Sequence, residues 1–214
     1  MIKNIIFDWS GVISDDLITV YRSIMVMFKS LGAKQISLEE FKREWEQPYM
    51  NFYKKYGIFT VGDDQKNREE EMVLYRATYT ATLAQYPIQP FPQVKETIQR
   101  FKEAGINMII LSSNFRDTIL ADIEEFGLQG MFGEINSDVH DKAVNIKETL
   151  QRNGFEPAET VFVGDTVHEI ESGKSAGIQT LAVTWGFNNE DKLRAANPDF
   201  IAHDLQKLES IILK

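Results

Sequence analysis

A short apolar stretch that ends in an acid, close to the first residue, constrains the fold of this chain most. The apolar residues Ile5–Phe7 follow one another without alternation, as in a strand that is covered on both faces of a parallel sheet. Asn4–Phe7 is therefore predicted to be a short buried strand. Asp8 follows at once and Gly11 marks a tight turn. Asp8 is thus expected at the carboxyl edge of the sheet, where open α/β folds bind their ligands.

Two later apolar stretches also end in polar side chains. The stretch that ends at Asn114 is predicted to be a buried strand followed by hydroxyl groups, and Val161–Gly164 a buried strand followed by Asp165. Glu169 lies one helical turn beyond, and Lys142 begins a helical pattern between the two strands. A single acid at a strand end is also an ordinary turn former or helix cap. The set of three strand ends and one lysine indicates a site.

The spacing of strands and helices predicts two structural parts. From Pro92 onward single strands alternate with single helices, which predicts a parallel sheet with helices on both faces. Between the first and second strands lies a helix-only block of roughly 70 residues, too long for an ordinary crossover. We therefore predict an α/β fold with a Rossmann-like parallel-sheet core, residues 1–14 and 90–214, and an inserted all-helical cap domain, residues 15–89.

Two connections join these parts, over residues 14–17 and 86–92. Pro87, Pro90 and Pro92 stiffen the second connection and end the helix before it. Both connections are predicted to be linkers that let the cap open and close over Asp8.

Composition narrows the classes of partner and nucleophile. The formal net charge of −9 argues against non-specific binding of nucleic acid or of an anionic membrane, both of which need clustered positive charge. The chain has no cysteine, which excludes a thiol nucleophile and a disulfide framework. No apolar run is long enough to span a bilayer and no leader precedes the first strand, so a cytoplasmic protein is expected. The sequence leaves open whether it is a monomer or a homodimer.

The order of the motifs resembles the haloacid dehalogenase superfamily of hydrolases, in the branch similar to phosphoglycolate phosphatases. The resemblance covers nearly the whole chain. Its motifs are the strand ending at Asp8, the hydroxyl strand ending at Ser113–Asn114, the lysine Lys142, the stretch Gly164–Gly177, and the tail segments 183–188 and 197–201. The four main motifs are specific in combination and not singly.

The resemblance implies a Mg²⁺-dependent phosphatase that acts on a small phosphorylated metabolite. Asp8 is then the nucleophile, which forms an aspartyl-phosphate that water later cleaves. Divalent metal would be held by the carboxylates of Asp8, Asp165 and Glu169 and by the backbone carbonyl of Ser10, because hard oxygen ligands suit Mg²⁺. Glu169 stands where an Asp is usual in the family, so it reaches one methylene further.

The resemblance also implies residues that bind the substrate. Ser113 and Asn114 would bind the phosphate, and Lys142 would neutralise both the nucleophile and the phosphoryl group. Gln47 lies in the cap segment where the specificity loop of the family often lies. Two simpler interpretations remain open at this stage: the polar residues 112–114 could only cap the next helix, and Lys147 could take the place of Lys142.

Ser10 is the main departure from the family pattern, because phosphatases of this family usually carry a second Asp there. That Asp protonates the leaving oxygen and then activates water, and losing such a group typically costs roughly 10²- to 10⁴-fold in rate. His168 could replace it, although it is expected to face elsewhere.

Two alternatives follow from Ser10. One is a phosphonoacetaldehyde hydrolase-like enzyme that cleaves a carbon–phosphorus bond with Lys54 or Lys55 as a Schiff base, because Asp8–Gly11 resembles the phosphonatase form. The other is a catalytically weakened phosphate-binding or regulatory protein.

Overall fold

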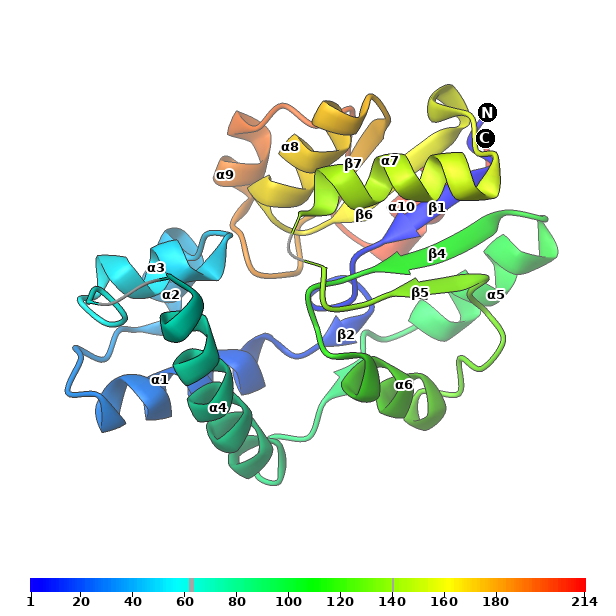
Figure 1. Cartoon of the computed structure of the whole chain (residues 1–214). Coiled ribbons are helices and arrows are strands. Elements are labelled where there is room, and N and C mark those ends of the chain that lie inside the picture. The colour runs from blue at the N-terminus through cyan, green and yellow to red at the C-terminus, as the bar shows by residue number, and fades with distance from the viewer. Residues whose placement is uncertain (62–63, 140) are drawn as a thin grey trace. The chain divides into compact units, whose positions relative to one another are not determined.

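The computed structural model covers nearly the whole chain (Figure 1). Gly62, Asp63 and His140 lie outside the described residues. The described residues are 1–61, 64–139 and 141–214. Within these ranges no helix is both long and apolar enough to cross a membrane.

The chain divides into two compact units. The first, which we call the core unit, comprises Met1–Asp15 and Gln89–Lys214. The second, the helical unit, comprises Asp16–Ile88 and so interrupts the core unit between Asp15 and Gln89.

A six-stranded sheet forms the centre of the core unit (Figure 1). Its strands are β1 (Asn4–Phe7), β4 (Asn107–Leu111), β5 (Glu134–Asn136), β6 (Thr160–Gly164), β7 (Gln179–Val183) and β8 (Phe200–Ala202). They lie in the order β5-β4-β1-β6-β7-β8, and every neighbouring pair is parallel. All residues of β1 and β6 are buried, which explains the continuous apolar residues 5–7 and 161–163. The predicted parallel-sheet core is confirmed.

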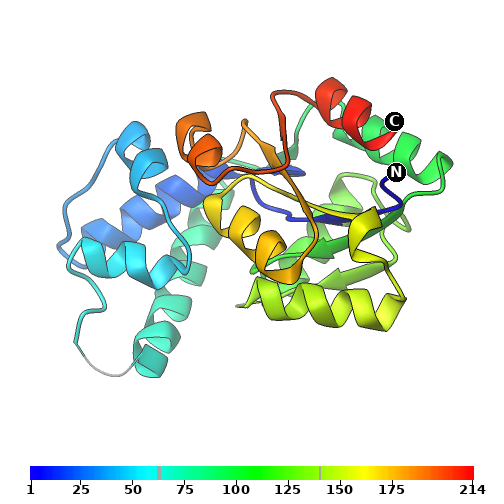
Figure 2. The same ribbon diagram turned by 90° about the horizontal axis from the view of Figure 1, so that it is seen from above.

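Helices cover both faces of this sheet. They are α5 (Val94–Glu103), α6 (Arg116–Glu125), α7 (Lys142–Asn153), the 3₁₀ turn η1 (Pro157–Glu159), α8 (Val167–Ala176), α9 (Glu190–Ala195) and α10 (Leu205–Ile212). Figure 2 shows α7 and α8 on one side of the sheet and α5 and α10 on the other.

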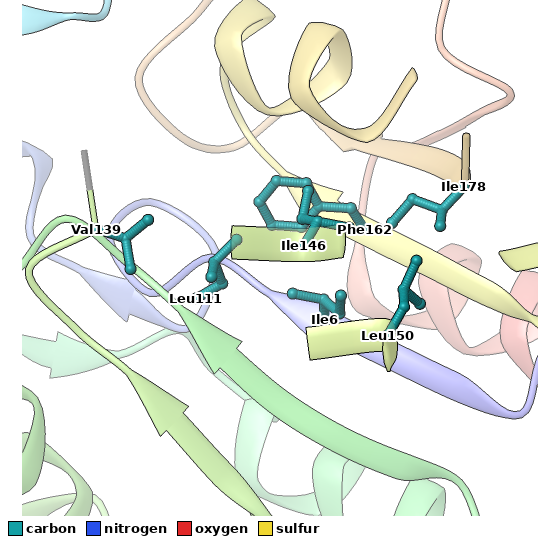
Figure 3. Close-up of a cluster of buried hydrophobic side chains, with 7 residues drawn as sticks. All are labelled: Ile6, Leu111, Val139, Ile146, Leu150, Phe162 and Ile178. Atoms are coloured by element: carbon teal, nitrogen blue, oxygen red, sulfur yellow. The ribbon is translucent and has the colours of Figure 1, made fainter. Parts of the chain in front are cut away.

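Successive side chains of β1 serve the two faces in turn. Ile6 belongs to a buried cluster on the α7 side (Figure 3). The ring of Phe7, the next residue, stacks on Phe101 of α5 with centroids 6.4 Å apart. The cluster drawn in Figure 3 comprises Ile6, Leu111, Val139, Ile146, Leu150, Phe162 and Ile178. Both faces of β1 are therefore packed, and its carboxyl end is held from two sides.

A short strand pair lies where the chain leaves and re-enters the core unit. The strands are β2 (Ser14–Asp15) and β3 (Gln89–Pro90), and they pair antiparallel with Asp15 opposite Gln89. The sequence predicted only linkers here, because two residues carry no periodic pattern and a proline argues against a strand. The pair was missed for that reason.

The helical unit contains α1 (Leu17–Ser30), α2 (Leu38–Glu44), α3 (Tyr49–Lys55) and α4 (Asp64–Leu83). Its described residues form helices and turns and no strand. Aromatic rings fill its centre: the ring of Phe52 lies 5.9 Å from that of Phe28 and 5.4 Å from that of Phe41. All three side chains are fully buried, so this unit has an apolar core of its own.

Glu71 of α4 is a buried carboxyl group in this unit. Only 4% of it is exposed, and it shares a hydrogen bond with the side chain of Tyr53, which is also buried. Burial raises the pKa of Glu71 to about 7, although the hydrogen bond from Tyr53 acts in the opposite direction. The folded state therefore holds the proton of Glu71 over a pH range in which an unfolded glutamate has lost it.

This proton makes stability depend on pH. The unfolded carboxyl group ionises near pH 4.5 and the folded one near pH 7, so the folded state binds more protons in this window and its stability falls as pH rises through it. In the wild type we expect the free energy of unfolding to fall by about 3 kcal/mol as the pH rises through this window. In Glu71→Gln, which has no proton to lose there, this fall should be absent. Urea denaturation at a series of pH values measures it. Glu70→Gln, at an exposed neighbour, should keep the wild-type profile, and an unchanged profile in Glu71→Gln would contradict the assignment.

Candidate active site

The order of the strands places two acids at one point of the sheet. After β1 the chain adds β4 and β5 on one side, and later adds β6, β7 and β8 on the other. The carboxyl ends of β1 and β6 therefore mark the point where the strand order reverses, and open α/β folds bind ligands there. Asp8 directly follows β1, and Asp165 directly follows β6.

Three buried carboxylates gather at this point. Asp8, Asp165 and Glu169 each offer one oxygen, and these oxygens lie within 4.8 Å of one another. Asp165 Oδ2 accepts a hydrogen bond from the backbone N–H of Phe187 at 2.6 Å, but Asp165 Oδ1 is buried with no hydrogen-bond partner. A buried carboxylate oxygen without a donor is costly, and a cation would supply the missing partner. Oxygen ligands of this kind fit Mg²⁺.

Lys142 is the cation already present at the cluster. Its Nζ lies 2.6 Å from Glu169 Oε1 and 3.2 Å from Asp8 Oδ2, and only 1% of the side chain is exposed. Lys142 is the first residue of α7, and the side chain of the preceding Asp141 caps that helix by accepting from the N–H of Val144. The cap fixes the start of α7 and therefore where the lysine side chain begins.

The pKa values of the three carboxyl groups follow from their burial and from the charges of their neighbours. Burial raises the pKa of Asp8 to about 6, with Lys142 lowering it and Glu169 raising it. Burial and the two neighbouring carboxylates hold the pKa of Asp165 well above its usual range. Burial opposes the charge of Glu169, but Lys142 keeps the pKa of that carboxyl low. The single positive charge of Lys142 thus compensates only part of the negative charge that the three carboxyl groups can carry.

Glu169 also has a structural role. Its Oε2 accepts hydrogen bonds from the backbone N–H and the hydroxyl of Thr166, so the two residues form a capping box at the start of α8. Its other oxygen accepts from Lys142. Both oxygens therefore have donors, whereas Asp165 keeps one oxygen without a donor. Direct metal ligation by Glu169 stays a prediction.

Two glycines make space for Asp165. A Cβ atom on Gly11 or on Gly186 would overlap the carboxylate of Asp165. Gly11 has a φ of +71°, a left-handed conformation that other residues rarely adopt. Gly186 precedes Phe187, whose N–H binds Asp165, so the loop after β7 closes directly on this carboxylate.

The hydroxyl strand brings one predicted residue into contact with the loop after β1. The side-chain amide of Asn114 donates to Ser10 Oγ at 2.9 Å. Ser113 lies beside it after β4 and is half-buried. The simpler interpretation, that the polar residues before α6 only cap it, is wrong: the residue at the cap position is Phe115, which makes no side-chain capping bond.

Trp9 anchors the same loop in a way that the sequence did not predict. The indole is fully buried, stacks on Phe126 with centroids 6.0 Å apart, and donates from Nε1 to Asp122 Oδ2 at 2.9 Å. Its backbone carbonyl accepts from the amides of residues 12–14. Trp9 lies between Asp8 and Ser10, so these bonds fix the segment that carries both. The only sequence signal is a tryptophan directly after Asp8.

Asn188 is a second contributor that the sequence did not predict. Its side-chain oxygen accepts from the backbone N–H of Val167 at 3.1 Å, and its own N–H donates to the carbonyl of Asp165 at 3.3 Å. It joins the loop after β7 to the start of α8.

Several other named residues belong to other elements of the chain. Gln47 is half-buried between α2 and α3 and belongs to the helical unit. Lys55 ends α3 and pairs with Glu44, while Lys54 precedes it on the exposed surface. Lys147 is exposed on α7, whereas Lys142 reaches the carboxylates.

His168, in the first turn of α8, is half-buried, and burial lowers its pKa. Of the charges that act on its ring, those of Glu169 and Lys142 are the strongest.

The ion pairs of Lys142 give a test of stability. Lys142→Met removes the cation and leaves two buried carboxylates uncompensated, so we expect the free energy of unfolding to fall by about 3–5 kcal/mol. Urea denaturation in chelator-treated buffer measures it. Lys147→Met, on the exposed side of the same helix, should stay within about 0.5 kcal/mol of wild type. Equal losses in the two variants would contradict a structural role for the Lys142 ion pairs.

The indole bond gives a second test. Asp122→Leu leaves the buried indole N–H of Trp9 without an acceptor, and we expect a loss of about 1–3 kcal/mol in the free energy of unfolding. Asp122→Asn keeps an acceptor oxygen and should lose less. Chemical denaturation followed by tryptophan fluorescence compares the two, and a larger loss in the Asn variant would sink the assignment.

Comparison with known proteins adds the family. Residues 5–183 match the haloacid dehalogenase-like hydrolases. The phosphoglycolate phosphatase of Synechococcus elongatus is 26% identical over 201 residues, which cover 92% of this chain and 91% of that protein. Pyrophosphatase PpaX of Oceanobacillus iheyensis is 25% identical over 218 residues, which cover 99% of this chain and 97% of that protein.

Solved structures have the same fold. A haloacid dehalogenase-like hydrolase from Streptococcus pneumoniae superposes with a TM-score of 0.79 at 24% identity, covering 98% of each chain. A hydrolase from Pseudomonas syringae superposes with a TM-score of 0.80 at 14% identity, covering 97% of this chain and 96% of that one. With the match over most of its length, this chain belongs to the haloacid dehalogenase-like hydrolase family.

Proposed function

We propose that the protein is a Mg²⁺-dependent phosphatase of a small phosphorylated metabolite, with Asp8 as nucleophile. The observation that carries the proposal is the buried group of Asp8, Asp165 and Lys142, in which one oxygen of Asp165 has no donor. The names of the relatives, phosphoglycolate phosphatase and pyrophosphatase, support a phosphate substrate.

The proposed chemistry uses two steps. A carboxylate oxygen of Asp8 attacks phosphorus, the bond from phosphorus to the leaving oxygen breaks, and an aspartyl-phosphate forms. Water then attacks that phosphorus and releases inorganic phosphate, which restores the carboxylate. Lys142, 3.2 Å from Asp8, stabilises negative charge through both steps. Ser113 and Asn114, after β4, would donate to the phosphate oxygens.

Mg²⁺ fits the donor set of this site. Asp8 and Asp165 would hold it with the backbone carbonyl of Ser10, and Glu169 would reach it directly or through water. When bound, the ion supplies positive charge that lets an anionic nucleophile approach an anionic phosphate. The chain's own contribution is to keep Asp165 in place, through the N–H of Phe187 and the space left by Gly11.

We propose that the helical unit acts as the cap over this site and selects the substrate, with Gln47 among its specificity residues. Support comes from its point of insertion, between β2 and β3, which follows Asp8 by only a few residues. The phosphonate alternative requires a lysine of this unit at the site; its two candidates, Lys54 and Lys55, are exposed on α3, where Lys55 pairs with Glu44.

The proposal predicts two separable losses. Asp8→Asn should remove turnover of 4-nitrophenyl phosphate with Mg²⁺ and remain folded. Mg²⁺ should raise the melting temperature of the wild type, because an ion that binds the folded state stabilises it by about 4 kcal/mol at a thousandfold excess over Kd. In Asp165→Asn this rise should be lost. Asp191→Asn, at an exposed acid of α9, is the matched control for both measurements. Wild-type turnover that survives in Asp8→Asn would refute the nucleophile.

A further inference from the structure

The loop that follows the proposed nucleophile Asp8, residues 9–14, contains no acidic side chain and no histidine. The side chain two residues after Asp8 is the hydroxyl of Ser10, whose oxygen accepts a hydrogen bond from the amide of Asn114. A general acid works best when its own acidity is close to the working pH, and an alcohol is far from this condition. Ser10 can therefore orient groups but cannot protonate a leaving oxygen.

Two charged groups near this loop, Lys142 and Asp122, are engaged by other residues. The ammonium of Lys142 lies between Glu169 at 2.6 Å and Asp8 at 3.2 Å, so it is committed to buried carboxylates. Asp122, the acid that contacts the loop through Trp9, accepts from the indole N–H and is held by that bond. Both groups are committed to these contacts and hold the site in place.

This arrangement determines which bonds can break. When Asp8 attacks, the electron pair of the broken bond stays on the leaving oxygen, and without a proton the leaving group departs as an anion. For an alkoxide this is costly, whereas a carboxylate or a phosphate is stable as an anion. The charge balances, because the charge carried by the attacking carboxylate leaves with the departing group.

We propose that the substrate is a phosphate compound whose leaving group departs as a stable anion, namely an acyl phosphate or a phosphoanhydride, and not an alkyl phosphate ester. This inference rests on the phosphatase function proposed above and specifies its substrate class. The same hydroxyl is a poor base for activating water in the second step, so the aspartyl-phosphate accumulates during turnover.

A series of ring-substituted phenyl phosphates tests the first step, because its members have similar shape and differ in the acidity of the leaving phenol. The value of kcat/KM should fall steeply from 4-nitrophenyl to 4-methylphenyl phosphate in the wild type. This ratio reports the step in which the leaving group departs, so slow hydrolysis of the intermediate does not mask the trend. Ser10→Asp should flatten the series, raising the poorest substrates by roughly 10²-fold or more. Ser10→Ala, which also lacks an acid, should keep the steep series.

Acetyl phosphate, pyrophosphate and glycerol phosphate then distinguish the natural classes. We expect kcat/KM for acetyl phosphate or for pyrophosphate to exceed that for glycerol phosphate by roughly 10²-fold or more. A higher value for acetyl phosphate indicates an acyl phosphate substrate, and a higher value for pyrophosphate indicates a phosphoanhydride. Acid-quenched protein should carry one phosphoryl group on Asp8, detected by mass spectrometry.

Three outcomes would overturn the inference. A flat wild-type series, or glycerol phosphate equal to acetyl phosphate, would refute the leaving-group class and leave the phosphatase function intact. A Ser10→Asp variant that melts like the wild type, yet keeps the steep series, would refute the role of position 10. No turnover of any compound, with no phosphoryl group on Asp8, would refute the phosphatase function and this inference together. The wild-type series decides the question even if the Asp variant does not fold.

Discussion

The structure of the site depends on one buried cation, the ammonium of Lys142. It lies between the carboxylates of Asp8 and Glu169, which follow different strands of the sheet. Without it, three acids within 4.8 Å would repel one another in a region from which water is excluded. One lysine compensates this charge only in part. The remaining negative charge, and the oxygen of Asp165 that has no donor, are the features that support the proposed metal ion.

The sheet restricts the conformational freedom of the segment that carries Asp8. β1 is the centre of the strand order and is covered by helices on both faces, so its carboxyl end has little freedom. Asp8 directly follows β1 and is therefore also restricted in position. The hydrogen bond from Trp9 to Asp122 fixes the residues that follow. Preorganisation of this kind places charge before the substrate arrives, which is how a site stabilises a transition state without rearranging.

Much of this architecture could be predicted from sequence, but two features could not. Short apolar runs ending in Asp8 and Asp165 carry their own signal, because burial on both faces requires continuous apolar residues. The group formed by these acids with Lys142 follows from parallel strands that share one edge. The bond from Trp9 to Asp122 joins residues 113 positions apart, and nothing in either neighbourhood marks the partner. The strand pair β2–β3 was missed because two residues are too few to show alternation.

The pairing of β2 with β3 has a consequence for how such chains diversify. Asp15 and Gln89 are direct partners in an antiparallel register, so the two ends of the excursion through the helical unit meet as neighbouring strands. A two-residue turn is the ordinary connection between strands in this relation. The core unit thus carries a hairpin stem onto which a bare turn or a whole domain can be grafted. Recombination at this stem would exchange the inserted domain while the six-stranded sheet stays unaltered.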